Sequence, residues 1–217
     1  MRVASRSKTT SYSLGGLLAA GVVALSGCAS HYAQVAPRLD LGSYDRIGLV
    51  TFSTNEGKAG LGQLATQRFG EEVLASQSGF ELMELGPADS AVARLLASGD
   101  AGAAAQELGR SRNIPAVFFG NLVVTNAKPH GGVSSGGQVN VGATVSTQMS
   151  VRLISTSSGG TLWRSSASAS QEVGQVALVA GRLPNISAQD PNDAYAALVS
   201  QNANNVTRDL RPTWVKQ

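Results

Sequence analysis

The 217-residue chain contains one cysteine, Cys28, and has few aromatic and charged side chains, at 5% and 14% of its residues. A single cysteine excludes an intrachain disulfide, so an exported domain with this sequence must rely on its core for stability. The Lys and Arg residues form no cluster of the kind that marks a nucleic-acid groove. The composition therefore argues against nucleic acid as a partner.

The chain also lacks an apolar run of the roughly 20 residues that a membrane-spanning helix requires. One shorter stretch, residues 14–25, is apolar or glycine throughout. It follows a leader that carries Arg2, Arg6 and Lys8 and no acidic residue. A short apolar run behind a basic leader is typical of a secretory signal peptide.

The cysteine follows directly on Leu25-Ser26-Gly27, and this order resembles the bacterial lipobox, in which the thiol is acylated and the leader is removed. We therefore predict a signal peptide at 1–27, an acylated Cys28 with a short linker at 28–43, and one domain at 44–217. A plain secretory signal with a nearby cysteine is the alternative. Ala29 stands where retention in the inner membrane typically uses Asp, so the sorting rule implies an outer-membrane anchor facing the periplasm.

Removal of the leader changes the charge of the chain. Three of the 17 basic residues and none of the 14 acidic ones lie in residues 1–27, so the mature chain is neutral. Stable attachment requires two or more acyl chains, because one chain binds a membrane only marginally. The membrane is thus the one partner that a motif in the sequence indicates directly.

The rest of the chain shows alternating strand and helix patterns. Brief apolar runs at 44–52, 80–85 and 115–124 predict strands. Apolar residues every four positions at 61–73 predict a helix with one apolar stripe, and 88–96 and 102–108 are rich in Ala and Leu. Asp190-Pro191 has the form of an N-cap followed by a first-turn proline, and it opens an amphipathic helix that stops before Pro212.

The clearest pattern is the alternation of apolar and polar residues over 139–154, with Ile154 as the one exception. Residues 155–160 supply a turn, and 161–173 alternate again through Trp163. This predicts a long antiparallel hairpin with one buried face. The complete order is strand, helix, strand, two helices, three strands and a helix, which predicts an α+β or α/β two-layer domain with a mixed sheet.

Three strings in this order resemble the CsgG/LpoB-like superfamily of periplasmic lipoproteins, which includes the N-terminal domain of TolB. They are Ile47-Gly-Leu-Val-Thr-Phe52, Ile114-Pro-Ala-Val-Phe-Phe-Gly-Asn-Leu122 and the hairpin from Val151 to Trp163. The resemblance covers about residues 44–212. Ser155 departs from it, since an Asp is common there, and Leu85-Gly86 stands where an Arg often occurs. The family shares no catalytic residues, so the resemblance implies no active site and no cofactor.

Two motifs offer chemical alternatives. Gly132-Val133-Ser134-Ser135-Gly136 matches a nucleophile elbow, but that elbow needs a helix after it and a later His, whereas His31 and His130 both precede Ser134. Residues 60–65 carry a glycine pattern that resembles part of a dinucleotide fingerprint, but the preceding turn is too long for it. Neither histidine has a neighbour at metal-ligand spacing. We therefore expect that the protein is not an enzyme and that it binds no cofactor and no metal.

The sequence predicts a non-enzymatic outer-membrane lipoprotein that acts as scaffold, adaptor or regulator in cell-envelope assembly or secretion. The alternative is an oligomeric export-channel subunit like CsgG, whose hairpins insert in the membrane, and a homo-oligomer stays open in either case. We expect the partner to contact the polar faces of the two long strands and a flexible loop at a hairpin tip. The residues assigned to that loop are His130, Gly131, Val133, Ser134, Ser135 and Gln138.

Overall fold

The computed structural model describes residues 32–55, 59–133, 139–178 and 191–216, and it divides the chain into two units. The smaller unit comprises residues 1–35 and 214–217, and the larger one residues 36–213. In the smaller unit, strand β1 (Tyr32–Val35) pairs with β8 (Thr213–Lys216), which begins at the end of the larger unit. Strand β1 lies in the predicted linker, and β8 lies beyond the last predicted element, so both strands correct the prediction. Each of the two strands has only four residues, and its partner lies at the other end of the chain. The local sequence pattern therefore predicts neither strand.

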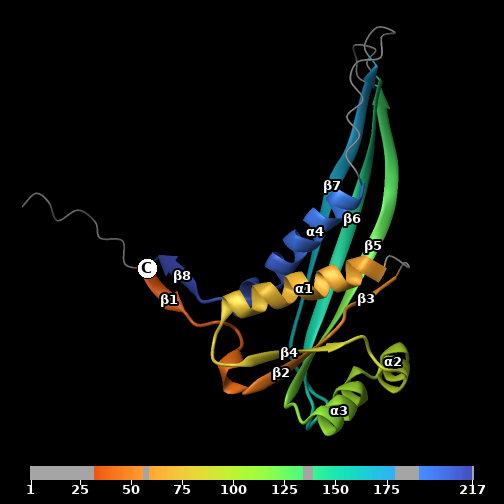
Figure 1. The fold of residues 1–217 in the computed structure, drawn as a ribbon. Helices are drawn as coiled ribbons and strands as arrows, with labels where there is room; N and C mark the ends of the chain where they lie inside the picture. The colour runs from red at the N-terminus through yellow and green to blue at the C-terminus, as the bar shows by residue number, and fades with distance from the viewer. Residues whose placement is uncertain (1–31, 56–58, 134–138, 179–190, 217) are drawn as a thin grey trace, which may run out of the picture. The chain divides into compact units, whose positions relative to one another are not determined.

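The larger unit is built on one mixed sheet (Figure 1). Its strands are β2 (Arg46–Val50), β3 (Ser53–Thr54), β4 (Glu81–Gly86), β5 (Ala116–Val133), β6 (Val139–Ser155) and β7 (Thr161–Leu178). The order is β4-β2-β5-β6-β7, and β3 pairs with β5 beside the end of β2. Strands β4, β2 and β5 run parallel, whereas β5, β6 and β7 are antiparallel. The predicted mixed sheet and the hairpin of β6 and β7 are confirmed.

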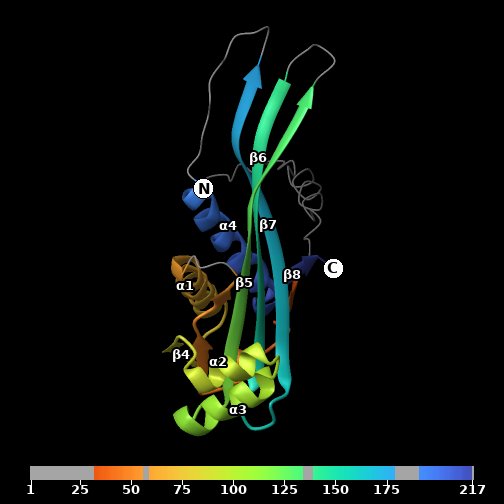
Figure 2. The same cartoon turned by 90° about the vertical axis from the view of Figure 1, so that its right-hand side faces the viewer.

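Helices α1 (Ala59–Ser76) and α4 (Pro191–Val206) form a layer on one face of this sheet (Figure 2). A shorter pair, α2 (Ser90–Ala97) and α3 (Ala101–Arg112), lies against the other face at one end of the strands. Two single-turn helices, η2 (Leu41–Ser43) and η3 (Arg208–Leu210), flank the body. This arrangement confirms the predicted α+β, two-layer fold class. No helix in the described ranges is long and apolar enough to cross a membrane.

The main core lies between the sheet and the α1–α4 layer. The predicted stripe of α1 supplies Ala65, Phe69 and Val73 to it, all fully buried. Four aromatic rings form a continuous chain through this core. The centroid distances are 5.3 Å from Phe52 to Phe69, 5.1 Å from Phe69 to Phe118, and 6.0 Å from Phe118 to Trp163. The last two pairs are edge-to-face, a favoured geometry for aromatic side chains.

The alternation of β6 is confirmed where the structure describes its side chains. Val145, Thr147, Met149, Val151 and Leu153 are buried on the core face, and Ser146, Gln148, Ser150 and Arg152 between them lie on the other face. Ile154 breaks the alternation because α3 covers the second face at this end of the strand. There Ile154 joins a separate cluster with residues of α2 and α3. The one exception in the sequence pattern therefore marks where the sheet is buried on both sides.

Strand β5 is much longer than predicted. It continues past Val124 through Thr125, then after a register shift through Lys128 to Val133, paired with β6. The predicted loop therefore requires a correction, because His130, Gly131 and Val133 belong to β5. Beyond the short β3, only β6 flanks this strand, so Pro129 lies in an edge strand, where a missing backbone N–H is tolerated.

The ends of the larger unit are fixed by one side chain at the end of α1. The amide nitrogen of Gln77 donates to the carbonyl oxygens of Leu39 and Leu210, each at 2.7 Å, and its oxygen accepts from the backbone N–H of Leu41 at 2.8 Å. Leu41 is fully buried. The predicted linker at 28–43 therefore needs correction over its last residues, which pack as part of the body.

Candidate functional site

The open face of β5, β6 and β7 lies opposite the main core and, beyond α2 and α3, carries mainly polar side chains, with Val123 as an exposed apolar one. Its serines match across the strands in register. Ser150 faces Ser166, and Ser146 faces Ser170. The exposed positions on this face include Asn121, Gln148, Ser166, Ser168 and Ser170. The polar strand faces predicted as contact surface are therefore exposed in the structure.

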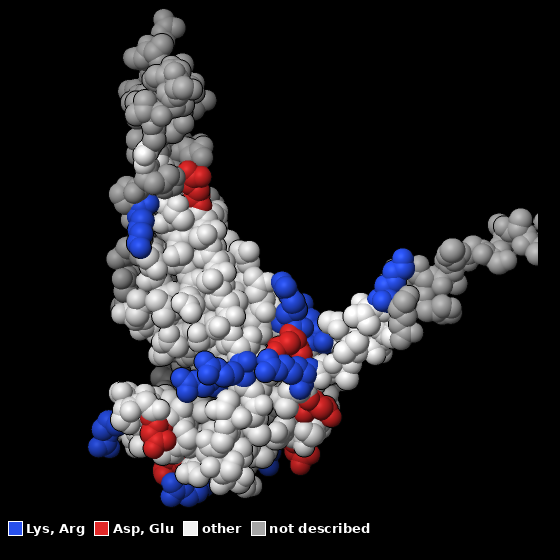
Figure 3. Space-filling view, turned by 180° about the vertical axis from the view of Figure 1, so that it is seen from behind, with Lys and Arg blue, Asp and Glu red and all other residues white. Residues whose placement is uncertain are grey.

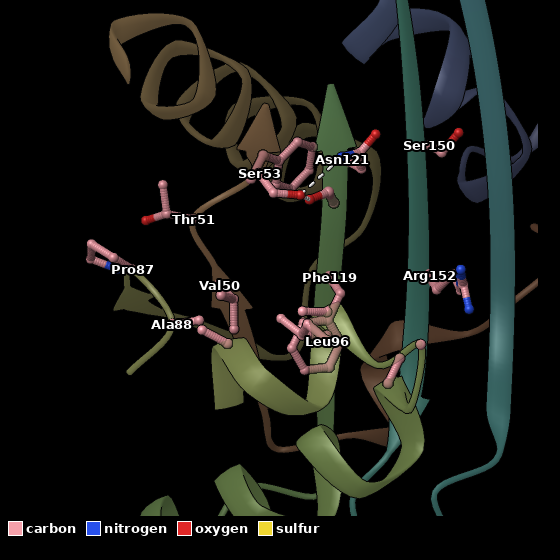
Figure 4. Close-up of a pocket in the computed structure, with 16 residues that line it drawn as sticks. Val50, Thr51, Ser53, Pro87, Ala88, Leu96, Phe119, Asn121, Ser150 and Arg152 are labelled. Atoms are coloured by element: carbon pink, nitrogen blue, oxygen red, sulfur yellow. Dashed lines mark hydrogen bonds between the residues drawn. The ribbon is translucent and has the colours of Figure 1, made fainter. Parts of the chain in front are cut away.

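A pocket of about 650 Å³ lies at the base of this face, where the face meets α2 (Figure 4). It lies where β2 ends at Val50, before the chain pairs with β5 again through β3. The backbone N–H of Thr51 still donates to the carbonyl of Gly86, and that of Phe52 donates to the buried hydroxyl of Thr66 at 2.8 Å. Ligand sites in open α/β sheets commonly lie beyond the carboxyl ends of parallel strands, and this pocket has that position.

The pocket has one apolar side and one polar side. Val50, Leu96 and Phe119 line the apolar side, together with alanines of α2 and of the connection before it. The polar side carries Ser53 and Asn121, whose side chains are joined by a hydrogen bond of 3.0 Å from Nδ2 to Oγ. The hydroxyl of Ser53 lies 3.4 Å from the carbonyl oxygen of Gly120. The site therefore suits a molecule with an apolar portion and a polar one.

Two arginines stand side by side at the edge of the pocket. Arg152 lines it from β6, and Arg164 is its direct cross-strand neighbour on β7. Both are exposed, and neither has an ion pair or hydrogen bond to a described residue. Figure 3 shows Lys and Arg side chains gathered in a band across the body. Like charges directly opposite each other destabilise a sheet, so this pair is not explained by stability.

The remaining predicted site residues fall in two groups. The backbones of His130, Gly131 and Val133 are placed in β5, where His130 is opposite Gly142 of β6. Ser134, Ser135 and Gln138 lie outside the described residues, as does the lipid-attachment residue Cys28. The structure thus joins the first three to the sheet but brings none of them into the pocket. Their role in partner contact stays a prediction.

The two alternative motifs have structural explanations. In the elbow-like motif, Gly132 and Val133 end a strand, and the strand β6 follows. In the glycine pattern, Gly62 lies in the first turns of α1, and a Cβ there would approach the carbonyl oxygen of Phe52 to 2.5 Å. Gly62 is therefore needed for close packing of α1 on the end of β2. The described residues include no group of three or more His, Cys, Asp or Glu that could hold a metal.

The paired carboxylates at Glu71 and Glu72 make local contacts on α1. Glu71 accepts hydrogen bonds from Arg68 at 2.8 Å and Gln67 at 3.1 Å, and these bonds, led by that from Arg68, lower the pKa of its carboxyl group. Glu72 pairs with Arg211, close to the end of the larger unit. Both therefore act as surface or structural groups.

The pocket was not predicted because its residues are far apart in sequence. Ser53, Asn121 and Ser150 come from three strands, and each reads alone as an ordinary strand or turn residue. A usable signal was present in Arg152, the only charged residue in the alternating segment 139–154. This single charged side chain in an otherwise uncharged strand lines the pocket, so it could have pointed to the site.

No family model matches the chain, and no curated protein matches it. Several solved structures show partial similarity to it at low sequence identity. The PelC dodecamer from Paraburkholderia phytofirmans is 15% identical, with 84% of this chain and 99% of that chain covered and a TM-score of 0.41. The lipoprotein GNA1162 from Neisseria meningitidis is 19% identical, with coverage of 58% and 83% and a TM-score of 0.34. A minor lipoprotein from Acinetobacter baumannii is 10% identical, with coverage of 80% and 98% and a TM-score of 0.32.

Proposed function

We propose that the chain is a lipoprotein of the bacterial outer membrane, anchored through acyl chains on Cys28 and facing the periplasm. The support is the sequence Leu25-Ser26-Gly27-Cys28 behind a basic leader and a short apolar run. Ala29 supports the outer over the inner membrane by its resemblance to the sorting rule. The chain between Cys28 and the start of β1 at Tyr32 is only a few residues long, so β1 begins close to the anchor.

In this position the protein acts as a non-enzymatic scaffold or adaptor in envelope assembly or secretion. The observation that carries this role is the open polar face of β5, β6 and β7. The core is complete on the opposite face, so these exposed serines and amides are not needed for folding. Ser and Asn side chains supply adaptable hydrogen bonding at some protein interfaces, such as those of antibodies. Such a surface suits a partner protein of the envelope.

The lack of acid–base groups in the pocket supports a role without catalysis. Its polar lining consists of hydroxyl groups, one amide and one guanidinium group, from Thr51, Ser53, Asn121, Ser150 and Arg152. General acid–base catalysis commonly uses His, Asp, Glu, Lys, Tyr or Cys, and none of these lines the pocket. The lining is suited to binding.

Anchoring is tested by intact mass spectrometry of protein extracted from membranes. We expect a chain that begins at residue 28 and carries acyl groups, and a Cys28→Ala variant without them. A wild-type chain that starts elsewhere, or that carries no acyl group, would contradict the anchor.

The contact surface is tested by photo-crosslinking in cells. A crosslinker at Gln148, on the open face, is compared with one at Arg68, which is exposed on α1. We expect a defined partner band from Gln148 and none from Arg68. The native mass of the acylated protein in mild detergent then separates the two functions. A monomer or dimer supports the adaptor, and a large closed ring supports the alternative of an export-channel subunit.

A further inference from the structure

The arginine pair beside the pocket makes no ion pair with a described residue, as is also true of Arg46 and Arg112. Ion pairs to an acidic side chain are made by Arg38, Arg68, Arg110 and Arg211. Arg152 and Arg164 face each other across β6 and β7 without a described counter-ion. Two guanidinium groups in this arrangement favour an anion, because a carboxylate or phosphate would relieve their mutual repulsion.

The acidic residues nearest in sequence to the pocket are engaged elsewhere. Asp89 follows the lining residue Ala88, and its carboxylate accepts from the backbone N–H groups of Ala91 and Val92 at the start of α2. Asp100 lies between the lining residues Gly99 and Ala101, and its carboxylate caps α3 by accepting from the N–H of Ala103 at 2.8 Å. No acidic residue is among those that line the pocket. The guanidinium group of Arg152 is thus the one charged group among the residues that line the pocket.

The apolar side of the pocket defines the rest of the ligand. Leu96 projects from α2 and Phe119 from β5, and Arg152 on β6 is the direct cross-strand neighbour of Phe119 (Figure 4). A volume of about 650 Å³ lies within the usual range of small-molecule sites, roughly 300–1,000 Å³. An ion without an apolar portion would leave this side unused. The combination favours an anion that carries a hydrocarbon group.

We propose that this pocket binds a small amphipathic carboxylate. The carboxylate is held by the guanidinium group of Arg152, and Arg164 adds positive charge beside it. The hydrocarbon portion lies against Leu96 and Phe119, and Asn121 and Ser150 are placed to bind a further polar group. This site does not depend on the membrane anchor, and it shares Asn121 and Ser150 with the open face proposed above as the partner surface.

The test is a calorimetric titration of the full chain carrying Cys28→Ala, so that no acyl chain competes with the probe. The probes are hexanoate, its neutral analogue hexanamide, and inorganic phosphate. We expect hexanoate to bind and the other two to bind at least roughly tenfold more weakly, as the loss of a charge-assisted or an apolar contact implies. The variant Arg152→Gln should weaken hexanoate by a similar factor. The matched control Arg110→Gln, an exposed arginine of α3, should leave its affinity unchanged.

Several results would overturn the proposal. Hexanoate that does not bind, or that binds equally well to the Arg152→Gln protein, would show that Arg152 does not form the site. If hexanamide bound as tightly as hexanoate, the negative charge of the ligand would not contribute to binding. If inorganic phosphate bound as tightly as hexanoate, the hydrocarbon portion would not contribute, and the site would bind anions in general. Because Arg152 is exposed, the variant should keep its fold, and Arg152→Lys, which retains the charge, should show intermediate affinity.

Discussion

The ring of Phe52 lies directly over the backbone of Gly120, so that a Cβ at Gly120 would come within 2.2 Å of the ring. Phe52 is nearly fully buried and begins the aromatic chain through the core. The glycine thus allows a strand of the sheet and an aromatic side chain to approach more closely than any other residue would permit.

We therefore expect Gly120→Ala to lower the free energy of unfolding by about 1–3 kcal/mol, as overpacking of a core does. Chemical denaturation measures it. Gly60→Ala is the matched control, because nothing lies within 4 Å of a Cβ there and the residue is helical. That change should be neutral or slightly stabilising. Equal losses from both changes would contradict the close contact.

A second prediction concerns a buried polar pair between α4 and β6. Asn202 is fully buried, and its amide nitrogen donates to the hydroxyl of Thr147 at 2.8 Å and to the Thr147 carbonyl at 3.1 Å. Asn202→Ala should cost about 1–3 kcal/mol, because the buried acceptors of Thr147 lose their donor. A double-mutant cycle with Thr147→Val should give a coupling energy above about 0.5 kcal/mol. Additive losses would show that the pair does not interact.

A third prediction follows from the position of Val145, which is fully buried on the core face of β6. Val145→Arg should prevent folding of the domain, because it places an unpaired charge in the core and costs more than about 4 kcal/mol. Gln148→Arg is the control on the exposed face of the same strand, and it should change stability by less than about 0.5 kcal/mol. Circular dichroism of the purified variants measures both. A folded Val145→Arg protein would contradict the packing of β6 described above.

The carboxyl group of Glu71 gives a prediction about pH. Its pKa is lowered mainly by the hydrogen bond from Arg68, so the contribution of this bond is complete above the usual Glu range and is lost as the pH falls through the lowered pKa. Arg68→Gln should raise the pKa of Glu71 toward its ordinary value of about 4.3, as measured by NMR titration. Gln67→Ala should raise it less. A larger rise of the pKa in Gln67→Ala would contradict this prediction, because it would make Gln67 the main cause of the lowered pKa.

The prediction for Gln77 concerns local rather than global stability. Gln77→Ala removes three hydrogen bonds to the chain segments at Leu39, Leu41 and Leu210. Hydrogen exchange at the N–H of Leu41 should accelerate by roughly tenfold or more, as the loss of at least 1.4 kcal/mol implies. The amides at the centre of β6 should change less. Equal acceleration at both sites would show that the end segments open only with the whole domain.

Most of the fold could be predicted from local patterns. The apolar stripe of α1, the alternation in β6 and the Asp-Pro start of α4 each follow from the periodicity of a single element. The predictions of these elements are confirmed because the periodicity or capping pattern lies within the sequence of each element. The sheet order was not predictable, because strand pairing depends on contacts between distant segments.

The errors have the same cause. Residues 125–133 contain Pro129 and two glycines and look like a turn, but pairing with β6 makes them a strand. Leu41 looks like a linker residue, yet hydrogen bonds to Gln77 fix it in the core. The pocket could not be predicted either, since it requires knowing that β2, β5 and β6 lie side by side. In each case the missing information is a contact with another segment of the chain, which the local sequence pattern does not show.

The three hydrogen bonds of Gln77 determine where mechanical load enters the domain. A pull on the chain ahead of Ala36 reaches the body at Leu39, and a pull on the last residues reaches it at Leu210. Both forces therefore arrive at the end of one helix, α1, which is packed along its length by Ala65, Phe69 and Val73. The neighbouring Asp209 accepts hydrogen bonds from the indole N–H of Trp163, so the same force also reaches the edge strand β7 of the sheet.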